Sequence, residues 1–296
     1  MSHPTIRGSL VALITPFNED GSVNFDKLGE LIDFHLANCT DALVILGTTG
    51  ESSTMSHEED NAVCEYTVKR VAGRIPIIAG SGSNSTQTML EKSLSYERLG
   101  ADGLLLITPY YNKTNEEGMY LHFKTVADAV KIPCILYNVP GRTGCSISVP
   151  NVARLSQHPN IVGIKEASGN MSYAAKVAKY LSDDFAMYSG NDDMIVPLLS
   201  IGASGVISVL ANIAPKETHQ MVFDYLEDRT DDARRAQIEL LDVINDLFIE
   251  VNPVPVKEAM NLLGMDVGGY RLPLTHMTQA HRETLRSSLA AAGFLK

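Results

Sequence analysis

The sequence is short of basic residues. Its 296 residues include 24 lysines and arginines against 35 aspartates and glutamates, which gives a formal net charge of -11 at pH 7. No long basic run interrupts this acidic balance. Because an acidic chain repels phosphate groups, we expect neither a nucleic acid nor an anionic membrane surface as a partner. If the chain handles an anionic substrate, the positive charge must be local to its site.

Cysteine is also scarce, and the four residues are Cys39, Cys64, Cys134 and Cys145. None of them forms a CxxC pair, and no histidine pair has zinc-finger spacing. We therefore interpret them as unpaired thiols of a reducing compartment and expect neither a disulfide nor a metal site.

Long hydrophobic segments are missing as well. No uninterrupted apolar stretch reaches the roughly 18 residues that a membrane-spanning helix needs. The first residues, Met1 to Gly8, lack a basic region followed by an apolar core, so they do not resemble a signal peptide. Together these absences predict a cytoplasmic protein without a membrane segment.

What the sequence does contain is a succession of short apolar runs separated by amphipathic stretches. Most runs are continuous rather than alternating, which is typical of parallel strands buried on both faces. The stretches between them are long enough for helices. The expected strands are 10–14, 42–46, 75–79, 103–107, 133–137, 161–165, 185–189 and 205–209, and the expected helices include 25–36, 58–71, 86–99, 117–130 and 173–181.

Several helix starts are marked by capping residues. Ser56 with Glu59, and Thr114 with Glu117, have the spacing of a capping box, in which each side chain satisfies an otherwise unpaired backbone N–H group. Pro150, two residues after Ser148, suits the first turn of a further helix.

Eight strands alternating with helices favour an α/β fold of the closed (β/α)₈ type, a TIM barrel, over an open doubly wound sheet. The dinucleotide fingerprint GxGxxG is absent, because Ser85 stands where Gly80-Ser81-Gly82 would need its third glycine. Beyond the eighth strand the pattern is helical over 215–227, 231–249, 255–263 and 279–292. We therefore predict a barrel domain over 1–228 and a C-terminal helical extension over 229–296.

In such barrels the catalytic groups lie where the strands end. The sixth predicted strand ends in Lys165. A desolvated lysine has a lowered pKa, so part of it is a neutral amine that can attack a carbonyl carbon and form a Schiff base. The alternative is a paired structural lysine. The adjacent Glu166 is an unsuitable partner, because neighbours in a strand face opposite ways.

The fifth predicted strand ends in Tyr137, which is either core filling or a proton shuttle, since a phenol both donates and accepts a proton. Arg142, on the loop that follows, offers a planar fork for a carboxylate.

The second and fourth strands are followed by loops with polar residues. Gly47 to Ser52 contains two threonines between glycines, whose backbone N–H groups can hold a carboxylate, although a capped turn would look similar. The loop lacks the GK[ST] ending of a phosphate-binding P-loop. Thr108 to Asn112 contains two adjacent tyrosines, which indicate either a binding or interface loop or simple packing.

Taken together and in this order, these segments resemble the dihydrodipicolinate synthase family, within the pyruvate-dependent Schiff-base aldolases. The resemblance covers essentially the whole chain and rests on 47–52, 108–112, 137–143, 163–169 and 252–257. It implies the condensation of pyruvate with L-aspartate 4-semialdehyde to 4-hydroxy-tetrahydrodipicolinate, in diaminopimelate and lysine biosynthesis. It also implies a lyase without a metal or other cofactor, usually assembled as a homotetramer from two dimers.

The resemblance assigns four catalytic residues. Lys165 matches the lysine that forms the imine with pyruvate, and Tyr137 matches the proton-shuttling tyrosine. Thr48 matches the relay partner of that tyrosine, and Tyr111 matches the tyrosine that completes the relay from a neighbouring subunit.

Four further residues are assigned to substrate binding. Backbone N–H groups near Thr48 and Thr49 match those that hold the pyruvate carboxylate. Arg142 matches the arginine that binds the semialdehyde carboxylate at the site entrance. Gly190 and Ile207 match backbone positions lining the pyruvate site.

Many members of the family are inhibited by lysine in a cleft at a subunit interface. Sensitive enterobacterial-type members carry His where this chain has Asp60 and Glu where it has Thr88. The lost Glu matters most, because a carboxylate neutralises the lysine ammonium, although Asp60 offers some compensating charge. We predict weak or absent inhibition by lysine. The cleft residues that do match are Ser52, Ser53, His57, Asn84 and Tyr110.

Two other functions remain as alternatives. One is a Schiff-base retro-aldolase on a sugar acid, similar to N-acetylneuraminate lyase, which shares the lysine and the tyrosine but needs no arginine for a short semialdehyde carboxylate. The other is a non-catalytic barrel that binds a keto acid. Arg142 favours the synthase over the first, and the intact set of Lys165, Tyr137, Thr48 and Arg142 argues against the second.

Overall fold

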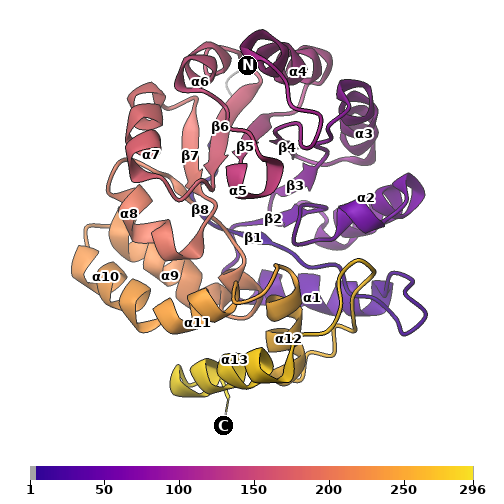
Figure 1. Ribbon diagram of the computed structural model, residues 1–296, viewed down its shortest axis with the longest axis vertical. Coiled ribbons are helices and arrows are strands. Elements are labelled where there is room, and N and C mark those ends of the chain that lie inside the picture. The colour runs from indigo at the N-terminus through magenta and orange to yellow at the C-terminus, as the bar shows by residue number, and fades with distance from the viewer. Residues whose placement is uncertain (1–4, 296) are drawn as a thin grey trace.

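Eight parallel strands close into a barrel in the order of the sequence (Figure 1). In the computed structural model, which describes residues 5–295, the first and last strands pair through Gly8 with Gly205 and Leu10 with Ile207. The predicted (β/α)₈ barrel is thereby confirmed. The strands are β1 (Gly8–Ala12), β2 (Ala42–Ile45), β3 (Ile77–Gly80), β4 (Gly103–Ile107), β5 (Cys134–Asn138), β6 (Ile161–Glu166), β7 (Ala186–Ser189) and β8 (Gly205–Ser208).

Helices form a ring around this barrel (Figure 1). The prediction of a single helix over 231–249 is wrong. The chain turns at Leu240, which divides this segment into α10 and α11. The remaining long helices lie where they were expected. The helices are α1 (Phe25–Ala37), α2 (His57–Val71), α3 (Thr86–Leu99), α4 (Glu116–Ala129), α5 (Pro140–Thr143), α6 (Val149–Leu155), α7 (Met171–Val177), α8 (Ile195–Leu199), α9 (Pro215–Leu226), α10 (Thr230–Glu239), α11 (Leu241–Asp246), α12 (Val254–Leu262) and α13 (Gln279–Ala291).

Capping groups fix where these helices begin. The capping box of Ser56 and Glu59 is present at the start of α2, and Ser148 caps α6 with Pro150 in its first turn. The box expected for Thr114 and Glu117 is wrong, because Asn115 is the capping residue of α4 and its side chain accepts the N–H of Gly118. An asparagine oxygen one residue further along satisfies the same kind of unpaired donor.

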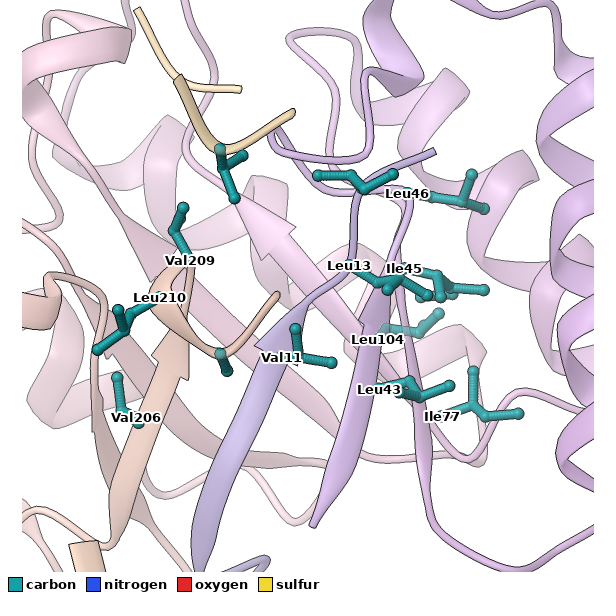
Figure 2. Packing of buried hydrophobic residues seen from close by; sticks show 14 of the residues in the cluster. Val11, Leu13, Leu43, Ile45, Leu46, Ile77, Leu104, Val206, Val209 and Leu210 are labelled. Atoms are coloured by element: carbon teal, nitrogen blue, oxygen red, sulfur yellow. The ribbon is translucent and has the colours of Figure 1, made fainter. Parts of the chain in front are cut away.

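Two apolar layers hold the barrel together. Alternate strand residues point outward against the helices, as Figure 2 shows for Val11, Leu43, Ile77 and Val206. The residues between them point inward and fill the barrel, among them Leu10, Val44, Ile135, Tyr137, Tyr188 and Ile207. A buried strand with apolar side chains on both faces reads as a continuous apolar run, which is why the strands could be recognised.

One irregularity interrupts this alternation in β6. Along β5, Cys134 pairs with Ile161, but the next residue, Ile135, pairs with Gly163, so β6 contains one extra residue at Val162. Ile161 and Ile164 both belong to the outer layer, whereas strict alternation from Ile161 would turn position 164 inward. A bulge of this kind re-aims the side chains that follow it. As a result, Lys165 faces the interior of the barrel, next to Tyr137.

The chain continues beyond α9 as a helical segment. The last helix, α13, packs on α11 and α12 and lies outside the ring, at its lower edge in Figure 1. All four cysteines are free thiols. Within residues 5–295 no helix is both long enough and apolar enough to cross a membrane.

Candidate active site

A cavity of about 460 Å³ lies at the carboxyl ends of β2 to β5. Catalytic groups of (β/α)₈ enzymes are found at this end of the barrel. Thr48, Tyr137 and Arg142 all line the cavity, although Thr48 follows β2 and the other two lie at the end of β5 and in α5 directly after it. The cavity also extends to a second group of residues from α2, α3, the turn before α2 and the loop after β4, which are Ser52, Ser53, His57, Asp60, Thr88, Lys92 and Tyr110.

Lys165 lies inside the barrel beside this cavity. Its Nζ is 4.5 Å from the centre of the Tyr137 ring, and 5% of the residue is exposed. Burial lowers the pKa of Lys165 to about 8, with Arg142 acting in the same direction and Asp192 opposing it. Burial acts this way because a low-dielectric environment disfavours the charged form. About a tenth of the lysine is then a neutral amine at pH 7. Glu166 faces the other way and accepts a hydrogen bond from the Asn138 side chain.

Tyr137 is a proton-carrying group next to this amine. Burial raises the pKa of the phenol, while the charge of Arg142 and the hydroxyl of Thr48 act in the opposite direction. The phenol therefore keeps its proton at neutral pH, and the Thr48 hydroxyl lies close enough to act on it. A phenol and a threonine hydroxyl can each donate and accept, so together they form a proton relay.

Asp192, which the sequence analysis overlooked, supplies the negative charge near Lys165. It is buried at the carboxyl end of β7, and its Oδ2 accepts the N–H groups of Val209 and Leu210 at 2.9 Å each. Its charge favours the protonated lysine. The sequence signal was available, since Asp192 lies three residues after the seventh strand, where catalytic groups of barrels are found.

The two positions assigned to the pyruvate site also lie here. A Cβ atom added to Gly190 would lie 2.6 Å from the Cβ of Ala167 and 3.1 Å from the Cε of Lys165. Only glycine leaves the space into which the lysine side chain extends. Ile207 belongs to β8 and is part of the inner layer that contains Tyr137.

Asn252 ties the substrate-binding residues to the C-terminal part of the chain. Its Nδ2 donates to Thr49 Oγ1 at 2.9 Å, and its carbonyl oxygen accepts from Arg142 Nη2 at 3.2 Å. Its own Oδ1 is buried and has no partner among residues 5–295. Asn252 was part of a matching segment, but sequence alone gave it no role, because 203 positions separate it from Thr49.

The structure does not bring every assigned residue into the cavity. The side chain of Tyr111 is 92% exposed, and the residue takes a left-handed backbone conformation with φ of 71°. Asn84 lies outside the cavity lining and accepts a hydrogen bond from Asn112 through its backbone carbonyl. Ser52, Ser53, His57 and Tyr110 do line the cavity. Within the described residues, no three His, Cys, Asp or Glu side chains are placed to hold a metal ion.

The lowered pKa of Lys165 has a measurable consequence for imine formation. The neutral amine is the nucleophile, so the rate of adduct formation with pyruvate is expected to rise about tenfold per pH unit below pH 8 and to level off above it. Rapid mixing with pyruvate, quenching with borohydride and intact-mass measurement give this rate at each pH. A profile still rising steeply at pH 10 would instead indicate a lysine with an ordinary pKa.

Comparison with known proteins places this geometry in a family. The family model of the dihydrodipicolinate synthetase family matches residues 5–292. The 4-hydroxy-tetrahydrodipicolinate synthase of Acetivibrio thermocellus is 51% identical over 295 residues, which cover 100% of each chain. The solved dihydrodipicolinate synthase of Acinetobacter baumannii, complexed with pyruvate, is 43% identical with a TM-score of 0.96, covering 98% of this chain and 100% of that one.

A further solved structure comes from Cyanidioschyzon merolae and contains bound lysine. It is 38% identical to this chain, has a TM-score of 0.95 and is covered over 99% of its length, against 98% of this chain. The family model, the curated relative and the two solved structures agree over nearly the full length of the chain. The chain belongs to the dihydrodipicolinate synthetase family.

Proposed function

We propose that this lyase condenses pyruvate with L-aspartate 4-semialdehyde to 4-hydroxy-tetrahydrodipicolinate, with Lys165 as the nucleophile. The observation that carries the proposal is a buried lysine with a pKa of about 8, which points into the barrel beside Tyr137. The relatives named above support it, since one is called a 4-hydroxy-tetrahydrodipicolinate synthase and another is complexed with pyruvate.

The reaction begins with the neutral amine. Lys165 attacks the keto carbon of pyruvate, and loss of water from the carbinolamine leaves a protonated imine. The imine withdraws electrons, so a methyl proton leaves and an enamine forms. The enamine carbon attacks the aldehyde carbon of the second substrate, which restores the imine, and the new alkoxide takes up a proton. The amino group of the second substrate then attacks the imine carbon, which closes the ring, expels Lys165 as a free amine and releases the product. Tyr137 and Thr48 are the hydroxyl groups placed to carry these protons.

We assign the substrate carboxylates to two places. Backbone N–H groups near Thr48 and Thr49 hold the carboxylate of pyruvate, and the Asn252 side chain fixes the Thr49 hydroxyl. Arg142 holds the carboxylate of the semialdehyde, with one guanidinium nitrogen already bound to the Asn252 carbonyl. Gly190 and Ile207 line the pyruvate side. In this assignment the proposed extension over 229–296 positions the site through Asn252.

The exposed Tyr111 points to a site completed by a second subunit. A tyrosine that is 92% exposed and held at positive φ is costly for an isolated chain, and such strain is retained where the surroundings require it. We propose that Tyr111 reaches the Thr48 and Tyr137 relay of a neighbouring subunit, in a homotetramer built from two dimers. Cytoplasmic location remains a prediction from the sequence.

Borohydride trapping tests the proposed function directly. Pyruvate followed by borohydride is expected to add the mass of a reduced pyruvate adduct at Lys165, as located by peptide mapping. Product analysis with L-aspartate 4-semialdehyde then separates the synthase from a sugar-acid aldolase. An unmodified Lys165 would refute the imine mechanism.

Replacing Arg142 by alanine separates binding of the two substrates. We expect kcat/KM for the semialdehyde to fall by about 10- to 100-fold, because a charged hydrogen bond to a carboxylate is worth roughly 1.5–3 kcal/mol. The borohydride adduct with pyruvate should still form. Steady-state kinetics on each substrate, together with the trapping experiment, measure both effects.

The matched control is Arg142→Lys, which keeps the charge but loses the planar fork and should recover only part of the loss. Removing the guanidinium also removes a charge that lowers the pKa of Lys165, so the pH profile of Arg142→Ala should move upward. Unchanged kinetics in Arg142→Ala would contradict the role.

A further inference from the structure

A buried ion pair lies in the wall of the cavity, away from the catalytic residues. Asp60 is in the first turn of α2 and Lys92 is in α3, and these helices pack side by side (Figure 1). Lys92 Nζ is 2.8 Å from Asp60 Oδ2, with the two side chains 12% and 2% exposed. Ser52 completes the group, because its hydroxyl accepts from Lys92 at 3.0 Å and donates to Asp60 at 3.2 Å.

The two charges depend on each other. Burial raises the pKa of Asp60, and the charge of Lys92 is the main effect that opposes it. The catalytic mechanism uses none of these three groups. A buried carboxylate that loses its cation is left with an uncompensated desolvation cost, so the ammonium of Lys92 is held firmly in place.

The arrangement has the chemistry of a binding site for a primary ammonium. Such a group needs an anionic oxygen and further acceptors around its three N–H bonds. Asp60 Oδ2 and the Ser52 hydroxyl provide these. Asp60 Oδ1 is buried without a hydrogen bond among the described residues, and the equally unbonded Tyr96 hydroxyl lies near this carboxylate. The cavity beside them is continuous with the space lined by Thr48 and Tyr137.

We propose that Ser52 and Asp60 form an ammonium subsite that the chain fills with its own Lys92. This inference deepens the effector cleft expected from the family resemblance, and it gives a structural reason for the predicted weak or absent inhibition by lysine. Asp60 was expected to offer some compensating charge, but its carboxylate is already paired.

Competition by a free amine is unfavourable for a physical reason. An incoming ammonium would replace one ion pair by an equivalent one, and it would leave the ammonium of Lys92 largely buried without its carboxylate. It would also lose translational and rotational freedom, which the tethered side chain has already lost. Thr88, at the rim of the same space, adds a hydroxyl but no charge.

Emptying the subsite should therefore create an amine-binding site. In Lys92→Met, Asp60 is left without its cation, so we expect a lower melting temperature that rises again when lysine or n-butylammonium is added. Calorimetric titration should show at least tenfold tighter amine binding than in the unsubstituted protein. Lysine and n-butylammonium are both used because the second lacks a carboxylate and an α-amino group.

Two controls identify the carboxylate as the group that binds. Lys92→Arg keeps the ion pair and should gain no amine affinity. The double variant Asp60→Asn, Lys92→Met is uncharged at the subsite and should also gain none. Equal amine binding by the double variant, or no gain in Lys92→Met, would overturn the proposal.

One measurement does not depend on how well a variant folds. The unsubstituted protein should not bind lysine with a Kd below about 1 mM, and tighter binding would overturn the proposal by itself. All these measurements are binding and melting experiments without substrate. They therefore remain informative if the imine mechanism at Lys165 is refuted.

Discussion

Lys165→Arg is expected to abolish the covalent route and to reduce kcat by more than about 10⁴-fold. General acid–base assistance accounts for roughly 10²–10⁴-fold, and the loss of a nucleophile should exceed this range because no imine can form. Arginine keeps the positive charge but does not become a neutral amine at accessible pH. The measurement is kcat with both substrates, combined with the mass of the protein after pyruvate and borohydride.

Tyr137→Phe is the matched control for this loss. It leaves the amine in place and removes only the phenol hydroxyl that carries protons. The borohydride adduct should therefore form, while kcat falls within the range of about 10²–10⁴-fold. If Lys165→Arg retained a trapped adduct, another lysine would be the nucleophile.

Among the substitutions proposed here, Lys257→Met is expected to lower the free energy of unfolding the most. Lys257 Nζ is 2.7 Å from Glu51 Oε1 in an ion pair whose side chains are 0% and 1% exposed, and it also donates to the Gly269 carbonyl. Burial lowers the pKa of Lys257, and Glu51 opposes this shift. Removing one partner leaves a buried charge unpaired, which costs about 3–5 kcal/mol of the free energy of unfolding.

Chemical denaturation followed by circular dichroism measures this loss. The double variant Glu51→Gln, Lys257→Met should recover a large part of it, because no uncompensated charge remains. Lys216→Met, at an exposed position in α9, is the control for the chemical change and should alter stability by no more than about 0.5 kcal/mol. Equal destabilisation by Lys257→Met and Lys216→Met would show that the ion pair does not contribute to the free energy of unfolding.

The barrel could be predicted from the sequence because each of its strands is recognisable from a short stretch of neighbouring residues. Each buried parallel strand is a continuous apolar run, and the rule that chemistry lies at strand ends selects Lys165, Tyr137 and Arg142 without further information. Helix boundaries were less accurate where two capping residues compete. Thr114 and Asn115 are both able to cap α4, and sequence spacing did not decide between them.

The contacts that position the site could not be predicted in the same way. Asn252 binds Thr49 from 203 positions away, and Lys257 binds Glu51 from 206 positions away. Lys92 and Asp60 were each expected on a helix, but only the packing of α2 against α3 turns them toward one another. Pairings of this kind depend on the tertiary arrangement, which local patterns in a single sequence do not reveal at the level of residue pairs.

Because β6 contains one extra residue, the number of residues in this strand decides which face of the barrel carries Lys165. Whether position 165 belongs to the inside or the outside of the barrel depends on whether the number of steps from Ile161 is odd or even, and Val162 changes that parity. The strand therefore tolerates a change in which apolar residue stands at a position far better than a change in how many residues there are. A substitution alters packing locally, whereas a deletion exchanges the faces of everything downstream and moves the amine into the helical layer. We therefore expect a one-residue deletion within β6 to abolish imine formation, whereas exchanges between apolar residues there should preserve it.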